Sequence, residues 1–130
     1  MLFSIAIPTL NSEKTIENCI KSCINQEYSK ELYEIVIIDN NSSDKSKNII
    51  NKFKEEINVL TYHNSERVSM YENHNLAIEK CSGNYIIFCH SDDTLDKFAL
   101  HNLYLHLESK NFPKKHICWG HSLYRDFNQY

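Results

Sequence analysis

Two adjacent carboxylates, Asp92 and Asp93, follow the apolar stretch 85–89 after His90 and Ser91 and are the first candidates for chemistry in this sequence. Two acids alone would repel a diphosphate, but they bind one when a hard divalent cation bridges protein and phosphate oxygens. The alternative is structural, because Asp92 could cap a helix that starts at Thr94, with Asp93 near the positive end of that helix. Both interpretations place the pair at the end of a buried strand.

Three further polar clusters also fall at the ends of predicted strands. They are the turn formed by Pro8, Thr9, Leu10 and Asn11, the segment 39–44 that begins with Asp39 and Asn40, and the loop 63–69. The carboxyl ends of parallel strands share one edge of the sheet, where open α/β sheets bind ligands. We therefore expect the four clusters to converge on one crevice. The turn after Asp39 could instead be purely architectural, because asparagine tolerates left-handed backbone conformations.

Other common site signatures are missing from the sequence. Only two glycines occur, and neither a dinucleotide-binding glycine motif nor a P-loop is present. The seven histidines are scattered, and only His90, beside the acidic pair, is a candidate for a site. The five cysteines lie inside apolar patterns without a Cys-x-x-Cys spacing, although Cys19 and Cys23 share one helical face. This pattern predicts buried free thiols, and neither a zinc motif nor a redox motif.

Strand and helix patterns alternate along the chain and would position these clusters. Strands are expected at 2–7 (closed by Pro8), 34–39, 58–62, the stretch that starts at Gly83, and 117–120. Four helices are expected. The first follows Asn11 or Ser12, either of which could cap it, and the second follows Asp44 with Ile57 facing inward. The third spans 70–81, and the fourth starts at Thr94 with Phe98 facing inward. Gly83 would end the third helix in a left-handed conformation. This order implies one α/β domain with parallel strands and right-handed crossovers.

Composition limits the possible classes of protein. The 130 residues suffice for one domain, and 42% hydrophobic with 24% charged residues is ordinary for a globular chain. The net charge of -3 argues against nucleic acid as a partner. No apolar run reaches the roughly 18 residues that a membrane span needs. We expect a cytoplasmic protein that could act at the inner face of the membrane.

The segments 4–11, 34–44 and 91–93, in this order, resemble the family 2 glycosyltransferases with the GT-A fold. The segment 70–78 is also similar to one that some bacterial members carry as Ile-Tyr-Asp-Ala-Met-Asn-Lys-Gly-Ile. The resemblance covers Ser4 to about Gly120. It implies a Rossmann-like nucleotide-binding domain with a mostly parallel sheet flanked by helices, a nucleotide-diphosphate-sugar donor (a UDP-sugar is favoured), and Mn2+ or Mg2+ as cofactor.

The resemblance also implies a role for individual residues. The 8–11 turn would lie near the nucleoside, and Asp39 would contact the base or ribose, with Asn40 where members often have a second acid. Ser91, Asp92 and Asp93 stand at the Asp-x-Asp position of the family. Asp93 would bind the metal, while Asp92 would hold the ribose or a metal-bound water and is a second candidate ligand. Further candidate donor-binding residues are Asn73 and, for the diphosphate, Arg67.

In this family, the half of the protein that binds the acceptor and supplies the general base follows the strand at 119–120. We therefore expect residues 1–130 to be an incomplete, donor-binding part of an inverting, metal-dependent enzyme, with the catalytic base unknown. The implied setting is bacterial cell-surface polysaccharide synthesis, with a carbohydrate or lipid-linked acceptor. Apolar surface exposed near Trp119 would favour a homodimer.

Two alternatives belong to other functional classes. A non-catalytic nucleotide-sugar-binding or interaction module would share every feature above except turnover. A receiver-type phosphoacceptor domain shares the alternation of strands and helices and the acidic strand ends. It is disfavoured because it needs paired acids after the first strand, where the turn at 8–11 stands.

Overall fold

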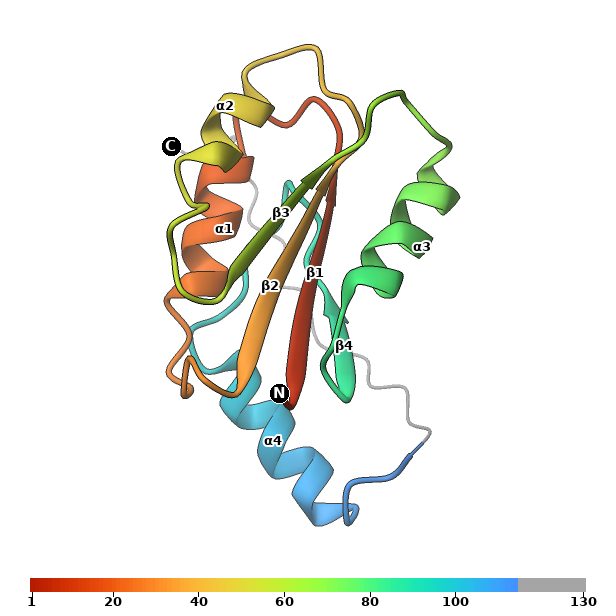
Figure 1. Ribbon diagram of the computed structural model, residues 1–130. Helices are drawn as coiled ribbons and strands as arrows, with labels where there is room; N and C mark the ends of the chain where they lie inside the picture. Colours follow the sequence, from red (N-terminus) through yellow and green to blue (C-terminus); the bar gives the residue numbers. More distant parts are fainter. Residues whose placement is uncertain (115–130) are drawn as a thin grey trace, which may run out of the picture.

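The computed structural model describes residues 1–114, and in it four parallel strands form a sheet in the order β3-β2-β1-β4 (Figure 1). The predicted α/β domain with a parallel sheet is therefore confirmed. The predicted strand at 117–120 lies outside the described residues. In chain order the elements are β1 (Phe3–Thr9), α1 (Ile16–Ile24), β2 (Tyr33–Asp39), α2 (Ser46–Asn51), β3 (Val59–His63), α3 (Met70–Lys80), β4 (Tyr85–Phe88) and α4 (Ala99–Ser109).

The register of the strands places their carboxyl ends in one row. Thr9 of β1 pairs with Asp39 of β2, which in turn pairs with His63 of β3. Paired residues of neighbouring strands point to the same face of a sheet, so these three side chains share a face. The end of β4 falls short of this row, because Phe88 pairs with Ala6.

Pro8 explains why β4 stops early. The N–H of Cys89 donates to Ala6 O at 3.0 Å, and Pro8, two residues further along β1, lacks the N–H needed to continue that ladder. On the other side, β1 remains paired with β2 as far as Thr9. The prediction that Pro8 closes the first strand is thus right for the edge facing β4 and wrong for the edge facing β2. The chain after Phe88 is free to turn across the end of the sheet.

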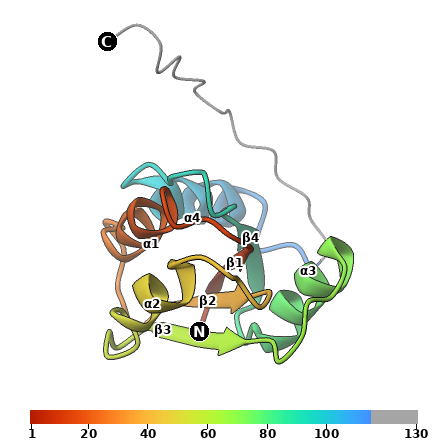
Figure 2. The same ribbon diagram turned by 90° about the horizontal axis from the view of Figure 1, so that it is seen from above.

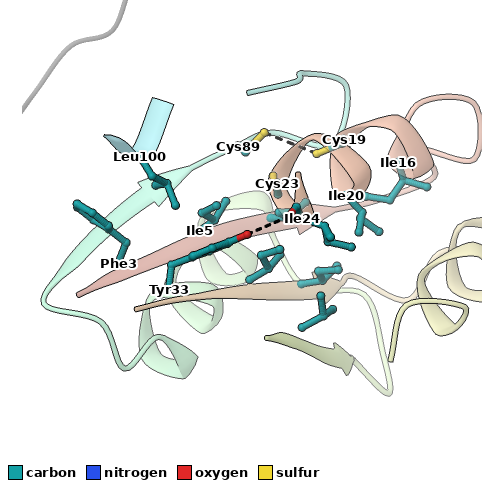
Figure 3. Packing of buried hydrophobic residues seen from close by; sticks show 14 of the residues in the cluster. Phe3, Ile5, Ile16, Cys19, Ile20, Cys23, Ile24, Tyr33, Cys89 and Leu100 are labelled. Carbon is teal, nitrogen blue, oxygen red and sulfur yellow. Dashed lines mark hydrogen bonds between the residues drawn. The ribbon is translucent and has the colours of Figure 1, made fainter. Parts of the chain in front are cut away.

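Helices cover both faces of the sheet (Figures 1 and 2). Helices α1, α2 and α4 pack on the face formed by the odd-numbered residues of β1 and β2, and Figure 3 shows this core from close by. Helix α3 packs on the other face, where Ala77 meets Ala6, Val36 and Ile38. The predicted inward face of α1 is confirmed, since all of its members are buried: Ile16, Cys19, Ile20, Cys23 and Ile24.

Several predicted helix boundaries are wrong. Helix α2 ends at Asn51, and Ile57, which was expected in the core, is 87% exposed. Helix α4 starts at Ala99 instead of Thr94, which leaves Phe98 43% exposed. Thr15 precedes the first residue of α1 and makes no side-chain capping bond, so neither Asn11 nor Ser12 caps that helix. Within residues 1–114, no helix is long and apolar enough to cross a membrane.

Gly83 has a role other than the predicted left-handed cap. Helix α3 is followed by Cys81 in an extended conformation, and no described glycine has a positive φ. A Cβ on Gly83 would instead lie 2.6 Å from the carbonyl carbon of Phe3 and 2.7 Å from Ser4 N. Glycine is needed here because the backbone that leads into β4 passes directly against the start of β1.

Candidate functional site

Hydrogen bonds join the loop after β1 to the loop after β2 at the carboxyl edge of the sheet. Asn11 N donates to Ser42 Oγ at 2.9 Å, and Ser43 N donates to Asn11 Oδ1 at 2.9 Å. Ser12 N donates to Ser46 Oγ at 2.7 Å. Asn11 adopts a positive φ of 50°, which asparagine tolerates better than most residues and which lets both its N–H and its side chain face the second loop. The two loops therefore form one connected rim.

The turn after β4 joins the same rim. Ser91 Oγ lies 2.6 Å from Ser12 Oγ, a hydrogen bond between residues 79 apart in the sequence. The expected convergence of these separate polar clusters on one edge is thus confirmed. Figure 1 shows the chain that leaves β1 and the chain that leaves β2 at the same end of the sheet.

Asp39 is a buried acid held by fixed partners. Its side chain is fully buried, Ser42 N donates to its carboxylate at 3.3 Å, and His63 Nδ1 lies 3.2 Å from Oδ2. The other ring nitrogen of His63, Nε2, lies 3.0 Å from Asn51 Oδ1. Both ring nitrogens of His63 thus have an oxygen partner, and a hydrogen bond to the Asp39 carboxylate requires the proton on Nδ1, because a carboxylate can only accept. The sequence analysis did not single out His63, because only the pairing of β2 with β3 brings it to Asp39.

Asn40 and Asn73 form a buried amide network beneath the loop 64–68. Asn40 Nδ2 donates to Val68 O at 2.9 Å, while Asn40 Oδ1 accepts from Val68 N at 2.9 Å. Asn64 Nδ2 donates to Asn40 Oδ1 at 3.1 Å and to Asn73 Oδ1 at 3.0 Å. Asn73 Nδ2 reaches Ile38 O at 3.3 Å. These amides hold in place the loop that carries the exposed Arg67.

The turn 8–11 offers little side-chain surface at its first two positions. Pro8 and Thr9 are buried within β1, and Thr9 Oγ1 has no hydrogen-bond partner among residues 1–114. The carbonyl of Thr9 accepts from Asn40 N at 2.9 Å. Leu10 and Asn11 are exposed and form the outer part of the turn. Contacts from this turn to a ligand would therefore come from Leu10 and Asn11 first.

Asp92 and Asp93 lie exposed on the turn that follows β4. Asp93 N donates to His90 O at 2.9 Å, and Asp93 Oδ2 lies 3.8 Å from His90 Nδ1 in a solvent-exposed pair. Such exposed pairs contribute little to stability. Helix α4 begins only at Ala99, so the alternative in which these acids cap a helix at Thr94 is wrong.

The donor set of this turn fits a hard cation. Within the described range 1–114, Asp92 is exposed and forms no hydrogen bond or ion pair, although its charge acts on the nearby Cys89, so its carboxylate is available to a ligand. Two accessible carboxylates at one turn are the oxygen donors that Mg2+ and Mn2+ use together with substrate phosphates. Ser91 anchors the turn to the rim through its bond to Ser12.

Sequence comparisons find a family and relatives for this chain. The model of the family described as "Glycosyl transferase family 2" matches residues 4–113. The poly(ribitol-phosphate) beta-glucosyltransferase of Bacillus spizizenii is 36% identical over 122 residues, which cover 88% of this chain and 18% of that protein. The poly(ribitol-phosphate) beta-N-acetylglucosaminyltransferase TarS of Staphylococcus aureus is 31% identical over 108 residues, covering 77% of this chain and 18% of TarS.

Solved structures share the fold. The crystal structure of S. aureus TarS 1–349 in complex with UDP has a TM-score of 0.80 and 27% identity, covering 85% of this chain and 33% of that one. The mannosyltransferase PcManGT from Pyrobaculum calidifontis, in complex with GDP-Man and Mn2+, has a TM-score of 0.74 at 20% identity, covering 81% and 32%. Compared with the full-length TarS sequence, this chain spans only 18% of the length. Because the family match extends over nearly all described residues, the chain belongs to glycosyl transferase family 2.

Proposed function

We propose that this chain is the donor-binding part of an inverting glycosyltransferase that uses a nucleotide-diphosphate-sugar, with a UDP-sugar favoured. The observation that carries the proposal is the single rim formed by the loops after β1, β2 and β4, with an exposed acidic turn on it. A nucleotide diphosphate needs a surface that binds the nucleoside and a cation site for the phosphates. The carboxyl edge of the sheet offers candidate residues for both. The likeness to TarS in complex with UDP supports the choice of nucleotide.

In this proposal the nucleoside lies against Leu10 and Asn11, above the buried Asp39. The Asp39 carboxylate, held by His63 and Ser42, supports the loop after β2 from below, and it contacts the base or ribose only if that loop moves. Asn40 and Asn73 act indirectly, because their amides hold the loop that carries Arg67. Arg67 would then extend toward the diphosphate.

Asp93 and, as a second ligand, Asp92 would hold Mn2+ or Mg2+ on the turn after β4. When bound, the cation supplies positive charge that neutralises the diphosphate and stabilises it as a leaving group. The carboxylates orient the cation, and the bond between Ser12 and Ser91 fixes the distance of the turn from the nucleoside loop.

We assign the role of general base to no residue in the range 1–114. Inverting transfer needs a base that takes the proton of the acceptor hydroxyl. Asp39 is buried and already bonded, and Asp92 and Asp93 would be committed to the cation. We therefore place the base, and with it the binding of a carbohydrate or lipid-linked acceptor, in a part of the protein other than this edge.

The setting of the protein is also part of the proposal. We propose synthesis of a bacterial cell-surface polysaccharide, because two relatives are named as transferases that act on poly(ribitol-phosphate). We place this activity in the cytoplasm, at the inner face of the membrane. We further propose a homodimer, because Ile86 and Phe88 on β4, which ends the strand order among residues 1–114, are each 38% exposed. Sedimentation of the purified chain tests the dimer.

Calorimetric titration with UDP and with GDP, in the presence and absence of Mn2+, tests the donor site. We expect UDP to bind more tightly than GDP and to need the cation. Asp93→Asn should abolish the gain from Mn2+, while Glu55→Gln, which changes an exposed acid after α2, should not. Equal UDP affinity with and without Mn2+, or an unchanged affinity in Asp93→Asn, would contradict the metal role.

A further inference from the structure

Three buried thiols meet where helix α1 packs against the chain that follows β4. Cys19 and Cys23 lie one turn apart on the inward face of α1, and Cys89 directly follows β4. All three Sγ atoms lie within 4.8 Å of one another, and Cys19 Sγ is 3.7 Å from Cys89 Sγ. Figure 3 shows the three sulfur atoms turned toward one another.

This spacing fits a common metal ligated by all three sulfurs. Zinc–thiolate bonds are about 2.3 Å long, so two sulfurs on one tetrahedral ion lie about 3.8 Å apart, and two on a trigonal ion about 4.0 Å. The distance of 3.7 Å between the sulfurs of Cys19 and Cys89 is close to these values, and all three sulfurs lie within 4.8 Å of one another.

The surroundings of the cluster restrict the kind of ion. The exposed fractions of Cys19, Cys23 and Cys89 are 0%, 0% and 2%. No histidine or carboxylate of residues 1–114 joins the three thiols as a further ligand, and the nearest polar atom is His90 O, 3.4 Å from Cys19 Sγ. Three sulfurs without a hard donor suit a soft ion and exclude the hard cations that bind the acidic turn.

The three thiols also differ in acidity. Hydrogen bonds from Cys19 and then Cys23 lower the pKa of Cys89, although burial opposes the shift. Hydrogen bonds with Cys19 and Cys89, and then burial, raise the pKa of Cys23. A metal binds the thiolate, so the lowered pKa of Cys89 favours its use as a ligand.

We propose that Cys19, Cys23 and Cys89 form a binding site for one soft, thiophilic d10 metal ion, held by three thiolates. On binding, three metal–sulfur bonds form and every S–H bond still present breaks, with no change of oxidation state. Three protons leave to solvent if all three groups are thiols, and two if Cys89 is already a thiolate. Three thiolates give a net charge of -1 with a divalent ion and -2 with Cu(I). Buried charge is costly, so we expect Zn(II) or Cd(II) to bind in preference to Cu(I).

An ion at this site would tie α1 to the start of the acidic turn. Cys89 lies two residues before Ser91, the anchor of that turn on the rim. The site is separate from the proposed Mn2+ site in both ligand chemistry and residues, so either can fail without the other.

Cd(II) titration of a Cys81→Ala/Cys118→Ala variant, which retains only the three clustered cysteines, tests the proposal. We expect one Cd(II) per chain, a near-ultraviolet thiolate-to-metal charge-transfer band, and release of two or three protons per ion. The band should persist when Asp92→Ala and Asp93→Ala are added and should disappear in Cys23→Val. Competition with Zn(II) and with Cu(I) then ranks the ions.

Binding of Cd(II) without the charge-transfer band, or release of one proton or none, would overturn the proposal. So would an unchanged band in a Cys23→Val variant with native circular dichroism. If Cys23→Val does not fold, the stoichiometry and proton count of the parent variant decide the question by themselves.

Discussion

Replacement of the buried Glu34 by glutamine should destabilise the fold far from the proposed donor site. Glu34, at the start of β2, is only 5% exposed. It accepts from Ser4 Oγ at 2.6 Å, from Ser82 N at 2.6 Å and from Ser82 Oγ at 2.9 Å. One side chain thus joins β1, β2 and the connection between α3 and β4.

The magnitude follows from these three bonds. A hydrogen bond to a charged group contributes about 1.5–3 kcal/mol, against about 1 kcal/mol for a neutral pair. Glutamine keeps the shape of Glu34 but loses the charge, and its NH2 group can accept none of the donated bonds. We expect the free energy of unfolding to fall by about 2–4 kcal/mol at pH 7. Urea denaturation measures it, and Glu31→Gln, an exposed change in the loop before β2, should cost under about 0.5 kcal/mol.

The effect should depend on pH. Burial, the largest single influence, raises the pKa of Glu34, but the hydrogen bonds from Ser4 and Ser82 together outweigh it, so the pKa lies below its ordinary value of 4.5. A lowered pKa means that the charged form stabilises the fold above pH 4.5, and that this stability is lost as the pH falls through the folded-state value. The difference between wild type and Glu34→Gln should therefore shrink in acid. A difference below about 0.5 kcal/mol at pH 7, or one that stays constant down to acid pH, would refute the reasoning.

Four further outcomes follow from other contacts. Gly83→Ala should cost about 2–3 kcal/mol in a thermal melt, because the new Cβ would lie 2.6 Å from backbone of β1. Ser12→Ala and Ser91→Ala should each weaken UDP binding, and a double-mutant cycle on stability should give a coupling of about 0.5–1.5 kcal/mol. Asn40→Ala should cost about 2–3 kcal/mol and speed hydrogen exchange at the Val68 amide, which loses its acceptor. The purified 130-residue chain should bind donor but transfer little sugar.

Matched controls distinguish each outcome from general damage. Asn84→Ala, next to Gly83 but exposed, should leave the melting temperature nearly unchanged. Ser65→Ala, in the same loop as Val68 and exposed, should leave exchange at Val68 unchanged. Additive effects of the two serine variants would contradict the bond between them, and robust turnover by the 130-residue chain would contradict the placement of the general base elsewhere.

The parallel sheet could be predicted because its strands are short apolar runs separated by helical patterns. In β2, four consecutive branched aliphatic residues precede Asp39, and such a run predicts a buried strand. Helix ends were harder to predict, since apolar residues match a helical spacing even outside the helix: Ile57 lies after the end of α2, and Phe98 lies before the start of α4. Their exposure depends on what packs beside them, which no local pattern encodes.

The site was predictable to the level of loops. The rule that parallel strands end on one edge is enough to bring Asn11, Ser42 and Ser91 together. The same rule cannot predict that the side-chain amide of Asn40 bonds to the backbone of Val68, or that His63 contacts Asp39. Both contacts depend on the exact register of neighbouring strands. The cysteine cluster was missed for the same reason, since Cys89 is 70 residues from Cys19 in sequence.

Paramagnetic broadening by Mn2+ in the presence of UDP, observed in the amide spectrum of the 15N-labelled chain, tests the donor site most directly. A donor site at the carboxyl edge predicts loss of the signals of Ser91, Asp92 and Asp93, with shifts in 8–11 and 39–43, and an unaffected signal for Glu34 at the opposite end of β2. Broadening centred away from the turn after β4, or unchanged by UDP, would contradict it.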